Sequence, residues 1–123
     1  MKFFLSKTEQ AILNLLWKNQ RWMSGVEFWK YFNANGKPCK RQTINTYLTR
    51  MTDKGILVKN ERKYMYTYKK EEWDQKKANE IITTMFDNSL KNFIVAITGS
   101  RKLSKKEAEE LKEYLSQIEE NNP

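Results

Sequence analysis

The sequence predicts a mostly α-helical protein with one small β-hairpin, divided into a basic N-terminal half and an acidic C-terminal half. Apolar residues recur at three- and four-residue spacing over most of the 123 residues, as in amphipathic helices. Residues 56–68 contain the one segment that alternates like a strand. Residues 1–70 hold 15 basic and 4 acidic side chains, a net charge of +11, whereas residues 71–123 hold 8 and 11, a net charge of −3.

The first two helices are predicted from their capping residues. Ser6 and Glu9 have the spacing of a capping box, in which each side chain accepts a hydrogen bond from the other residue's backbone N–H. Apolar residues follow at helical spacing, so a first helix is expected to reach about Trp17. Ser24 and Glu27 repeat the capping pattern and predict a second, shorter helix.

A third helix is predicted from about Lys40 to Lys54. It follows a loop at residues 33–38 that contains glycine and proline, and Gly55 is a typical residue directly after a helix end. Apolar residues spaced i, i+4 and i+7 give this helix a stripe for burial. Its other face carries hydrogen-bonding side chains, which are Arg41, Gln42, Asn45, Thr46, Thr49 and Arg50.

Two strands are predicted after the third helix, one at Ile56–Val58 and one at Tyr64–Tyr68, with a polar and basic tip at residues 59–63 between them. Three helices followed by a hairpin with a charged tip form the layout of a winged helix-turn-helix domain. All of this layout lies in the basic half of the chain.

This layout predicts binding to double-stranded DNA. The N-terminal side chains of a helix in the major groove reach base edges, and basic side chains on a hairpin contact phosphates or enter a minor groove. The predicted DNA-binding residues are Lys40, Arg41, Gln42, Thr43, Asn45, Thr46, Arg50, Arg62 and Lys63.

Two features of the basic half allow a second interpretation. The tyrosines at alternate positions of residues 64–68 suit base stacking in a single-strand binder, but a half-buried strand has the same spacing, and we favour packing. Cys39 directly precedes the third helix and is a candidate redox switch, although an inert loop thiol is the favoured interpretation.

Residues 71–123 predict amphipathic helices without a sheet. Apolar residues recur from Ala78 on both sides of a break at residues 87–89, and a turn is expected at residues 98–100. Ser104 and Glu107 have the spacing of a third capping box and open a last helix whose apolar residues follow at 3-4-3 spacing. About 50 residues of this kind rarely fold alone, so we expect a homodimer, with packing onto the chain's own first half as the alternative. The predicted dimerisation residues are Ile81, Ile82, Met85, Phe86, Leu90, Phe93, Ile94, Leu111, Leu115 and Ile118.

The composition argues against an enzyme. With no histidine and one cysteine, the chain lacks the ligands of common zinc and iron–sulfur sites and the residues of Ser-His-Asp or Cys-His catalysis. It also lacks the glycine motifs of nucleotide-binding loops. We therefore expect no catalytic residue, no metal and no cofactor. No apolar run reaches the length of a membrane helix, so a cytoplasmic protein without membrane insertion is expected.

Three segments resemble the penicillinase repressor family, which includes the β-lactamase, methicillin-resistance and copper-transport repressors. They are Leu5–Glu9, Leu15–Trp17 and above all Thr43–Ile56, whose Thr-Ile-x-Thr-x-Leu-x-Arg-x-x-x-Lys-Gly pattern is similar to the family's recognition helix and the start of its wing. The resemblance implies a homodimeric repressor that binds a palindromic operator near antibiotic-resistance or metal-export genes. Gln42 and Asn45 depart from the Lys and Arg that family members often carry there.

In the antibiotic-responsive members, a membrane sensor-transducer protease signals the drug, and the repressor is cut at an Asn–Phe bond in its dimerisation half. The resemblance therefore makes Asn92–Phe93 the candidate proteolytic site. The cysteine pair that copper repressors carry near the C-terminus is absent, which favours antibiotic-resistance-type genes over copper-transport genes.

The favoured interpretation is a homodimeric transcriptional repressor with a winged-helix DNA-binding domain at residues 1–70 and a helical dimerisation domain at residues 71–123. One alternative is a winged-helix protein-interaction module whose basic face binds an acidic partner. Another is a DNA-binding regulator that responds to a small ligand bound between the two halves, with Trp29, Tyr47 or Phe86 lining the pocket.

Overall fold

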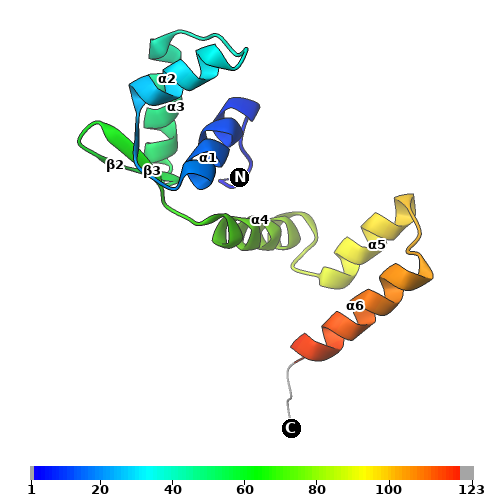
Figure 1. Cartoon of the computed structure of the whole chain (residues 1–123). Coiled ribbons are helices and arrows are strands. Elements are labelled where there is room, and N and C mark those ends of the chain that lie inside the picture. Colours follow the sequence, from blue (N-terminus) through cyan, green and yellow to red (C-terminus); the bar gives the residue numbers. More distant parts are fainter. Residues whose placement is uncertain (1, 120–123) are drawn as a thin grey trace. The chain divides into compact units, whose positions relative to one another are not determined.

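The computed structural model describes residues 2–119 and confirms the predicted fold class. Six helices and a small three-stranded sheet form the described part of the chain (Figure 1). The chain folds into two compact units, residues 1–80 and 81–123. The elements in chain order are α1 (Lys7–Asn19), β1 (Met23–Ser24), α2 (Gly25–Ala34), α3 (Arg41–Asp53), β2 (Leu57–Asn60), β3 (Lys63–Tyr66), α4 (Lys70–Met85), α5 (Leu90–Ser100) and α6 (Lys105–Ile118).

All three predicted capping boxes are present. At the start of α1, the Glu9 backbone N–H donates to the Ser6 Oγ at 3.3 Å, and the Ser6 N–H donates to the Glu9 Oε1 at 3.0 Å. The same reciprocal bonds begin α2 at Ser24 and α6 at Ser104. These bonds satisfy N–H groups that have no partner inside the helix, which is why the short sequence pattern locates the helix starts so well.

The sheet is antiparallel, with strand order β1-β3-β2. The hairpin was predicted, but its tip is shorter than expected, because Lys59, Asn60 and Lys63 belong to the strands and the turn consists of Glu61 and Arg62. Polar residues can extend strands here because the hydrogen bonds between strands come from the backbone. Glu61 has a φ of 58° and makes the tight turn. The two-residue strand β1 was not predicted.

The helices of the second half differ from the prediction at two places. Helix α4 begins at Lys70, two turns before the apolar periodicity that starts at Ala78. The sequence did not indicate this earlier start, because the first turns of α4 are mostly polar. Helix α5 continues through the turn predicted at residues 98–100, and the Thr98 hydroxyl donates to the Ile94 carbonyl at 2.8 Å within it. The break at residues 87–89 is confirmed, since Asp87 and Asn88 both have positive φ.

One hydrophobic core lies in the first unit. Its fully buried side chains come from all three N-terminal helices, the sheet and the first turns of α4, and they include Ile12, Leu16, Phe28, Ile44, Leu48, Met51 and Trp73. In contrast, neither α5 nor α6 contains a buried residue. No helix among the described residues is long and apolar enough to cross a membrane.

Aromatic contacts attach the start of α4 to this core. The Trp73 ring lies 4.8 Å from the Phe3 ring and 6.2 Å from the Trp17 ring, measured between centroids. The Trp17 Nε1 donates to the Tyr68 carbonyl at 3.0 Å. The beginning of α4 is therefore part of the first compact unit, although the helix continues beyond it.

Candidate nucleic-acid interface

Helix α3 presents a polar face because its apolar stripe is anchored in the core. Ile44, Leu48 and Met51 are completely buried. At 100° per residue, the opposite side of the helix is centred on Gln42 and Thr46, and both are exposed. The burial of one stripe thus fixes which side chains face outward.

Every predicted DNA-binding residue is exposed. Lys40 precedes the helix as its N-cap and makes no side-chain capping bond. Arg41, Gln42, Asn45, Thr46 and Arg50 lie on α3, as does Thr43, which lies at the edge of the polar face and also borders a cavity. Thr49 was not among the predicted site residues, although its exposed position one turn after Thr46 places it on the same face.

Asn45 occupies a special position at the junction of α2 and α3. A β-carbon built on Gly25, the first residue of α2, would lie only 2.9 Å from the Asn45 Oδ1. Asn45 therefore approaches the start of α2 as well as being exposed, and Gly25 provides the space for its carboxamide. This contact was not visible in the sequence, since the two residues are 20 positions apart.

The loop before α3 is tied to α2 by hydrogen bonds. The Trp29 Nε1 donates to the Cys39 carbonyl at 3.0 Å, and the Asn33 Nδ2 donates to the same oxygen at 3.4 Å. The Asn33 Nδ2 also donates to the Trp29 carbonyl at 2.8 Å. These bonds position the backbone directly before Lys40 and hence the start of α3.

The hairpin supplies exposed positive charge in the same compact unit. Arg62 lies in its turn and Lys63 begins β3, and both side chains are exposed. The Lys59 Nζ lies 5.5 Å from the centroid of the Tyr64 ring, a cation–π contact that holds a third cation near the turn. Lys59 was not among the predicted site residues, although the sequence placed it in the same basic tip as Arg62 and Lys63. The tyrosine rings of β3 belong to packing, since Tyr64 is buried and Tyr66 is half-buried.

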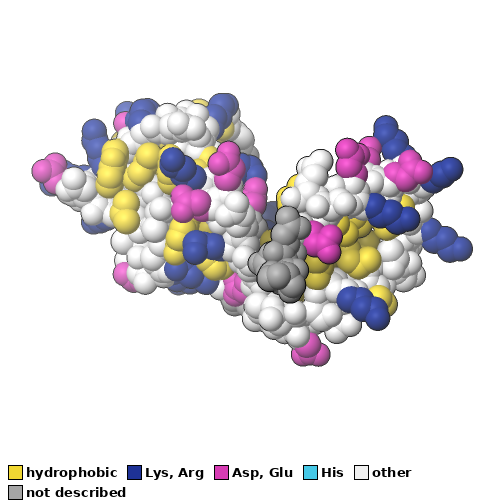
Figure 2. All heavy atoms as spheres, turned by 90° about the horizontal axis from the view of Figure 1, so that it is seen from below, with side chains coloured by type: hydrophobic (Ala, Val, Ile, Leu, Met, Phe, Trp, Pro, Cys, Tyr) yellow, Lys and Arg dark blue, Asp and Glu magenta, His cyan; other side chains and the backbone are white. Residues whose placement is uncertain are grey.

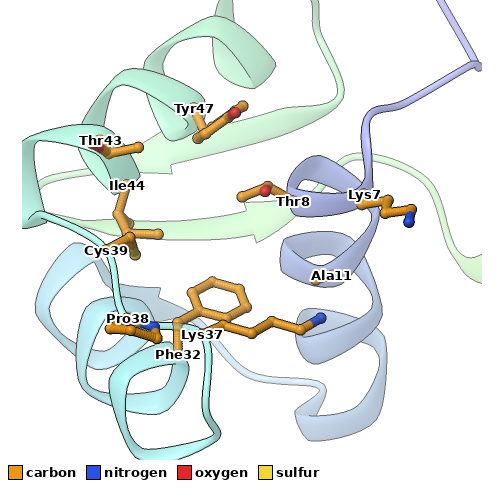
Figure 3. Close-up of a pocket in the computed structure, with 10 residues that line it drawn as sticks. All are labelled: Lys7, Thr8, Ala11, Phe32, Lys37, Pro38, Cys39, Thr43, Ile44 and Tyr47. Atoms are coloured by element: carbon orange, nitrogen blue, oxygen red, sulfur yellow. The ribbon is translucent and has the colours of Figure 1, made fainter.

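A cavity of about 340 Å³ lies beside α3 within the first unit (Figure 3). It is not the ligand pocket between the two halves that one alternative interpretation expected, since its whole lining belongs to the first unit. Of the residues named for that pocket, Tyr47 lines this cavity, whereas Trp29 and Phe86 do not. The lining comes from α1, the end of α2, the following loop and α3, namely Lys7, Thr8, Ala11, Phe32, Lys37, Pro38, Cys39, Thr43, Ile44 and Tyr47.

The second unit exposes much apolar surface (Figure 2). None of the predicted dimerisation residues is buried, and Met85, Leu90, Leu115 and Ile118 are between 42% and 57% exposed. The Phe86 and Phe93 rings contact each other edge-on at a centroid distance of 5.3 Å. An exposed apolar surface of this kind is typical of a site that binds another molecule.

The Asn92–Phe93 bond lies in the first turn of α5. The Asn92 N–H donates to the Oγ of the N-cap Ser89 at 3.1 Å, and the Asn92 side chain is exposed. A protease that needs an extended substrate must unwind this turn before cutting the bond.

Comparison with known proteins agrees with this architecture. The profile of the family described as penicillinase repressor matches residues 5–117, which include both compact units almost completely. A penicillinase repressor of Staphylococcus aureus is 25% identical over 121 residues, covering 93% of this chain and 92% of that protein. The resemblance found in the sequence is thereby confirmed. The chain belongs to the penicillinase repressor family, a family of transcriptional repressors and not an enzyme class.

Proposed function

We propose that the protein is a homodimeric repressor that binds a palindromic operator in double-stranded DNA through α3 and the hairpin. The observation that carries this proposal is the exposed polar face of α3, held outward by the complete burial of Ile44, Leu48 and Met51. A helix of this kind fits the major groove, where Asn and Gln pair with adenine and Arg with guanine. Occupation of the operator then blocks transcription sterically.

Within this proposal, residues 1–70 bind DNA and residues 71–123 form the dimer. The net charge of +11 on the first segment attracts phosphates, whereas the −3 on the second segment does not. The exposed apolar residues of α5 and α6 supply the surface that a second copy covers. A symmetric dimer then presents two copies of α3 to successive major grooves of an inverted repeat.

We further propose that the repressor controls antibiotic-resistance-type genes and is released when a membrane sensor-transducer protease cuts the Asn92–Phe93 bond. Cleavage there would cut α5 in its first turn and separate the rest of α5 and all of α6 from the DNA-binding segment, which would leave a monomer with a lower affinity for a two-site operator. Mass spectrometry of the chain from β-lactam-treated cells tests this. A fragment ending at Asn92 is expected, whereas an intact chain in induced cells would contradict release by cleavage.

The test of the main proposal is selection of bound duplexes from random DNA, followed by binding titrations at several salt concentrations. We expect an inverted repeat to be recovered. Affinity for it should fall by about a thousandfold or more between about 50 and 200 mM salt, because each phosphate contact releases a counterion. Recovery of no preferred sequence, or an affinity that is independent of salt, would contradict the proposal.

A further inference from the structure

We propose that the cavity beside α3 binds a small carboxylate with a compact apolar body, and that its occupancy weakens DNA binding. The binding site rests on the structure alone, and only the coupling to DNA rests on the function proposed above. The cavity is lined by α1 on one side and by the end of α2, the following loop and α3 on the other, and these segments surround a common space in Figure 3.

The apolar part of the lining selects the body of the ligand. Phe32 and Ile44 are buried core residues that form part of the wall, and Ala11 and Pro38 continue it. Sites for small molecules are mostly apolar with a few polar groups, and a volume of about 340 Å³ is at the lower end of their range. A single aromatic ring or a short branched aliphatic chain suits this space.

The charged part of the lining selects a negative group. Lys7 and Lys37 line the cavity and no Asp or Glu does. Neither lysine forms an ion pair among the described residues, so their charge is available to an anion. Figure 3 shows the Lys37 side chain extending from the loop toward α1, whereas the Lys7 ammonium points outward. Lys37 is therefore the expected carboxylate partner.

Coupling to DNA follows from the wall that α3 provides. Thr43 and Tyr47 belong to α3, and Cys39 lies on the loop that sets its start. A bound anion neutralises positive charge next to the DNA-binding face of α3, so the ligand lowers the electrostatic attraction of this face for DNA. By reciprocity, DNA weakens ligand binding by the same factor that the ligand weakens DNA binding.

Cys39 makes the site easy to test, because it is the one cysteine in the chain and lines the cavity. The rate of its alkylation by iodoacetamide is measured on the full chain without DNA, with benzoate, benzamide or inorganic phosphate present. At about ten times its dissociation constant, benzoate should slow the reaction about tenfold. Protection by none of the three, or equal protection by benzamide or by phosphate, would overturn the proposed ligand class.

Two substitutions test whether benzoate protects Cys39 by binding in this cavity. Lys37→Gln should abolish protection by benzoate, whereas Lys30→Gln, which changes an exposed lysine of α2 outside the cavity lining, should preserve it. Protection that survives Lys37→Gln would overturn the assigned site. Amide chemical shifts of Thr43 and Tyr47 provide a second readout, and we expect both to move with benzoate.

The coupling between benzoate and DNA binding is tested separately. The selected duplex is titrated with the protein, with and without saturating benzoate. We expect the affinity for DNA to fall about fivefold or more. Benzoate binding without any change in DNA affinity would overturn the coupling, while a chain that binds benzoate but no DNA would overturn the proposed function and leave the site intact.

Discussion

Gly25 of α2 and Asn45 of α3 are in such close approach that a β-carbon on Gly25 would lie 2.9 Å from the Asn45 Oδ1. Real β-carbons essentially never come so close to another heavy atom. The contact joins the first turn of one helix to the side chain of another that we assign to DNA. If Asn45 contacts the operator as proposed, helix packing and operator recognition share one residue.

Gly25→Ala should displace the Asn45 carboxamide while leaving the fold intact. The atom in the way is the end of a side chain, which can turn aside, so we expect the free energy of unfolding to change by less than about 1 kcal/mol. Affinity for the operator should fall about tenfold, since a base contact of Asn45 is disturbed. Gly99→Ala is the matched control, because nothing lies within 4 Å of the added carbon. Equal operator binding by both variants would contradict a reading role for Asn45.

Gln42→Ala should relax the sequence preference at one base pair per half-site. Gln42 lies at the centre of the exposed face of α3 and can form a paired hydrogen bond with adenine. The expected cost is about 1–3 kcal/mol of discrimination against the wrong base. Repeating the selection from random DNA with the variant measures the sequence preference at each base pair. An unchanged consensus sequence would show that Gln42 does not contact a base.

Arg62→Ala and Lys63→Ala should weaken binding to all duplexes by a similar factor, because the hairpin turn is assigned to phosphates and not to bases. Each variant should also reduce the slope of log affinity against log salt by about 1. Salt-dependent titrations on the selected duplex and on a scrambled duplex of equal length measure both the loss of affinity and the change in slope. A loss confined to the selected duplex would instead indicate base recognition by the hairpin.

Glu9 should stabilise the fold in a pH-dependent manner. Burial by itself would raise the pKa of Glu9, but hydrogen bonds from Ser6 and the charge of Lys54, whose Nζ lies 3.6 Å from the Oε2, leave that pKa below its ordinary value. The ionised form is thus favoured by folding. Its contribution is fully present above the unfolded-state pKa of 4.5 and is lost as the pH falls through the lower folded-state pKa.

Glu9→Gln should therefore destabilise the protein by about 1 kcal/mol at neutral pH and by less in acid. Urea denaturation at a series of pH values, followed by tryptophan fluorescence, measures the difference. Glu107→Gln changes the equivalent capping residue of α6, which is half-buried and outside the first unit, and serves as the comparison. A pH-independent loss for Glu9→Gln would mean that the carboxylate charge contributes nothing.

Leu115→Glu should dissociate the dimer. Leu115 is 42% exposed in the single chain, and a charge at a covered apolar position is expensive to bury. Gln117→Glu adds the same charge to the polar side of α6 and should leave the dimer unchanged. Sedimentation velocity distinguishes the two, and a monomeric wild-type chain at micromolar concentration would contradict dimerisation itself.

The sequence predicted those features that depend on neighbouring residues. The capping boxes at Ser6, Ser24 and Ser104 and the buried stripe of α3 are local patterns, and the structure contains all of them. Features that join distant segments were missed. Strand β1 exists because Met23 pairs with Tyr64, and two residues alone have no strand signal.

The same reason explains what was missed in the site. The Gly25–Asn45 approach depends on how α2 and α3 pack, and the cavity is lined by residues between Lys7 and Tyr47 that the fold brings together. The start of α4 was missed because its polar first turns are held by the single buried Trp73 and not by a periodic stripe.

The most direct test of the central claim is a map of backbone amide shifts when the selected duplex is added to the full chain. We expect the largest changes at residues 40–50, which form the N-cap and most of α3, and at residues 61–63 of the hairpin, with smaller changes in the buried core. Large changes at Lys69, directly before α4, and at Lys70, Lys76 and Lys77 within it, with α3 unaffected, would contradict DNA binding through α3.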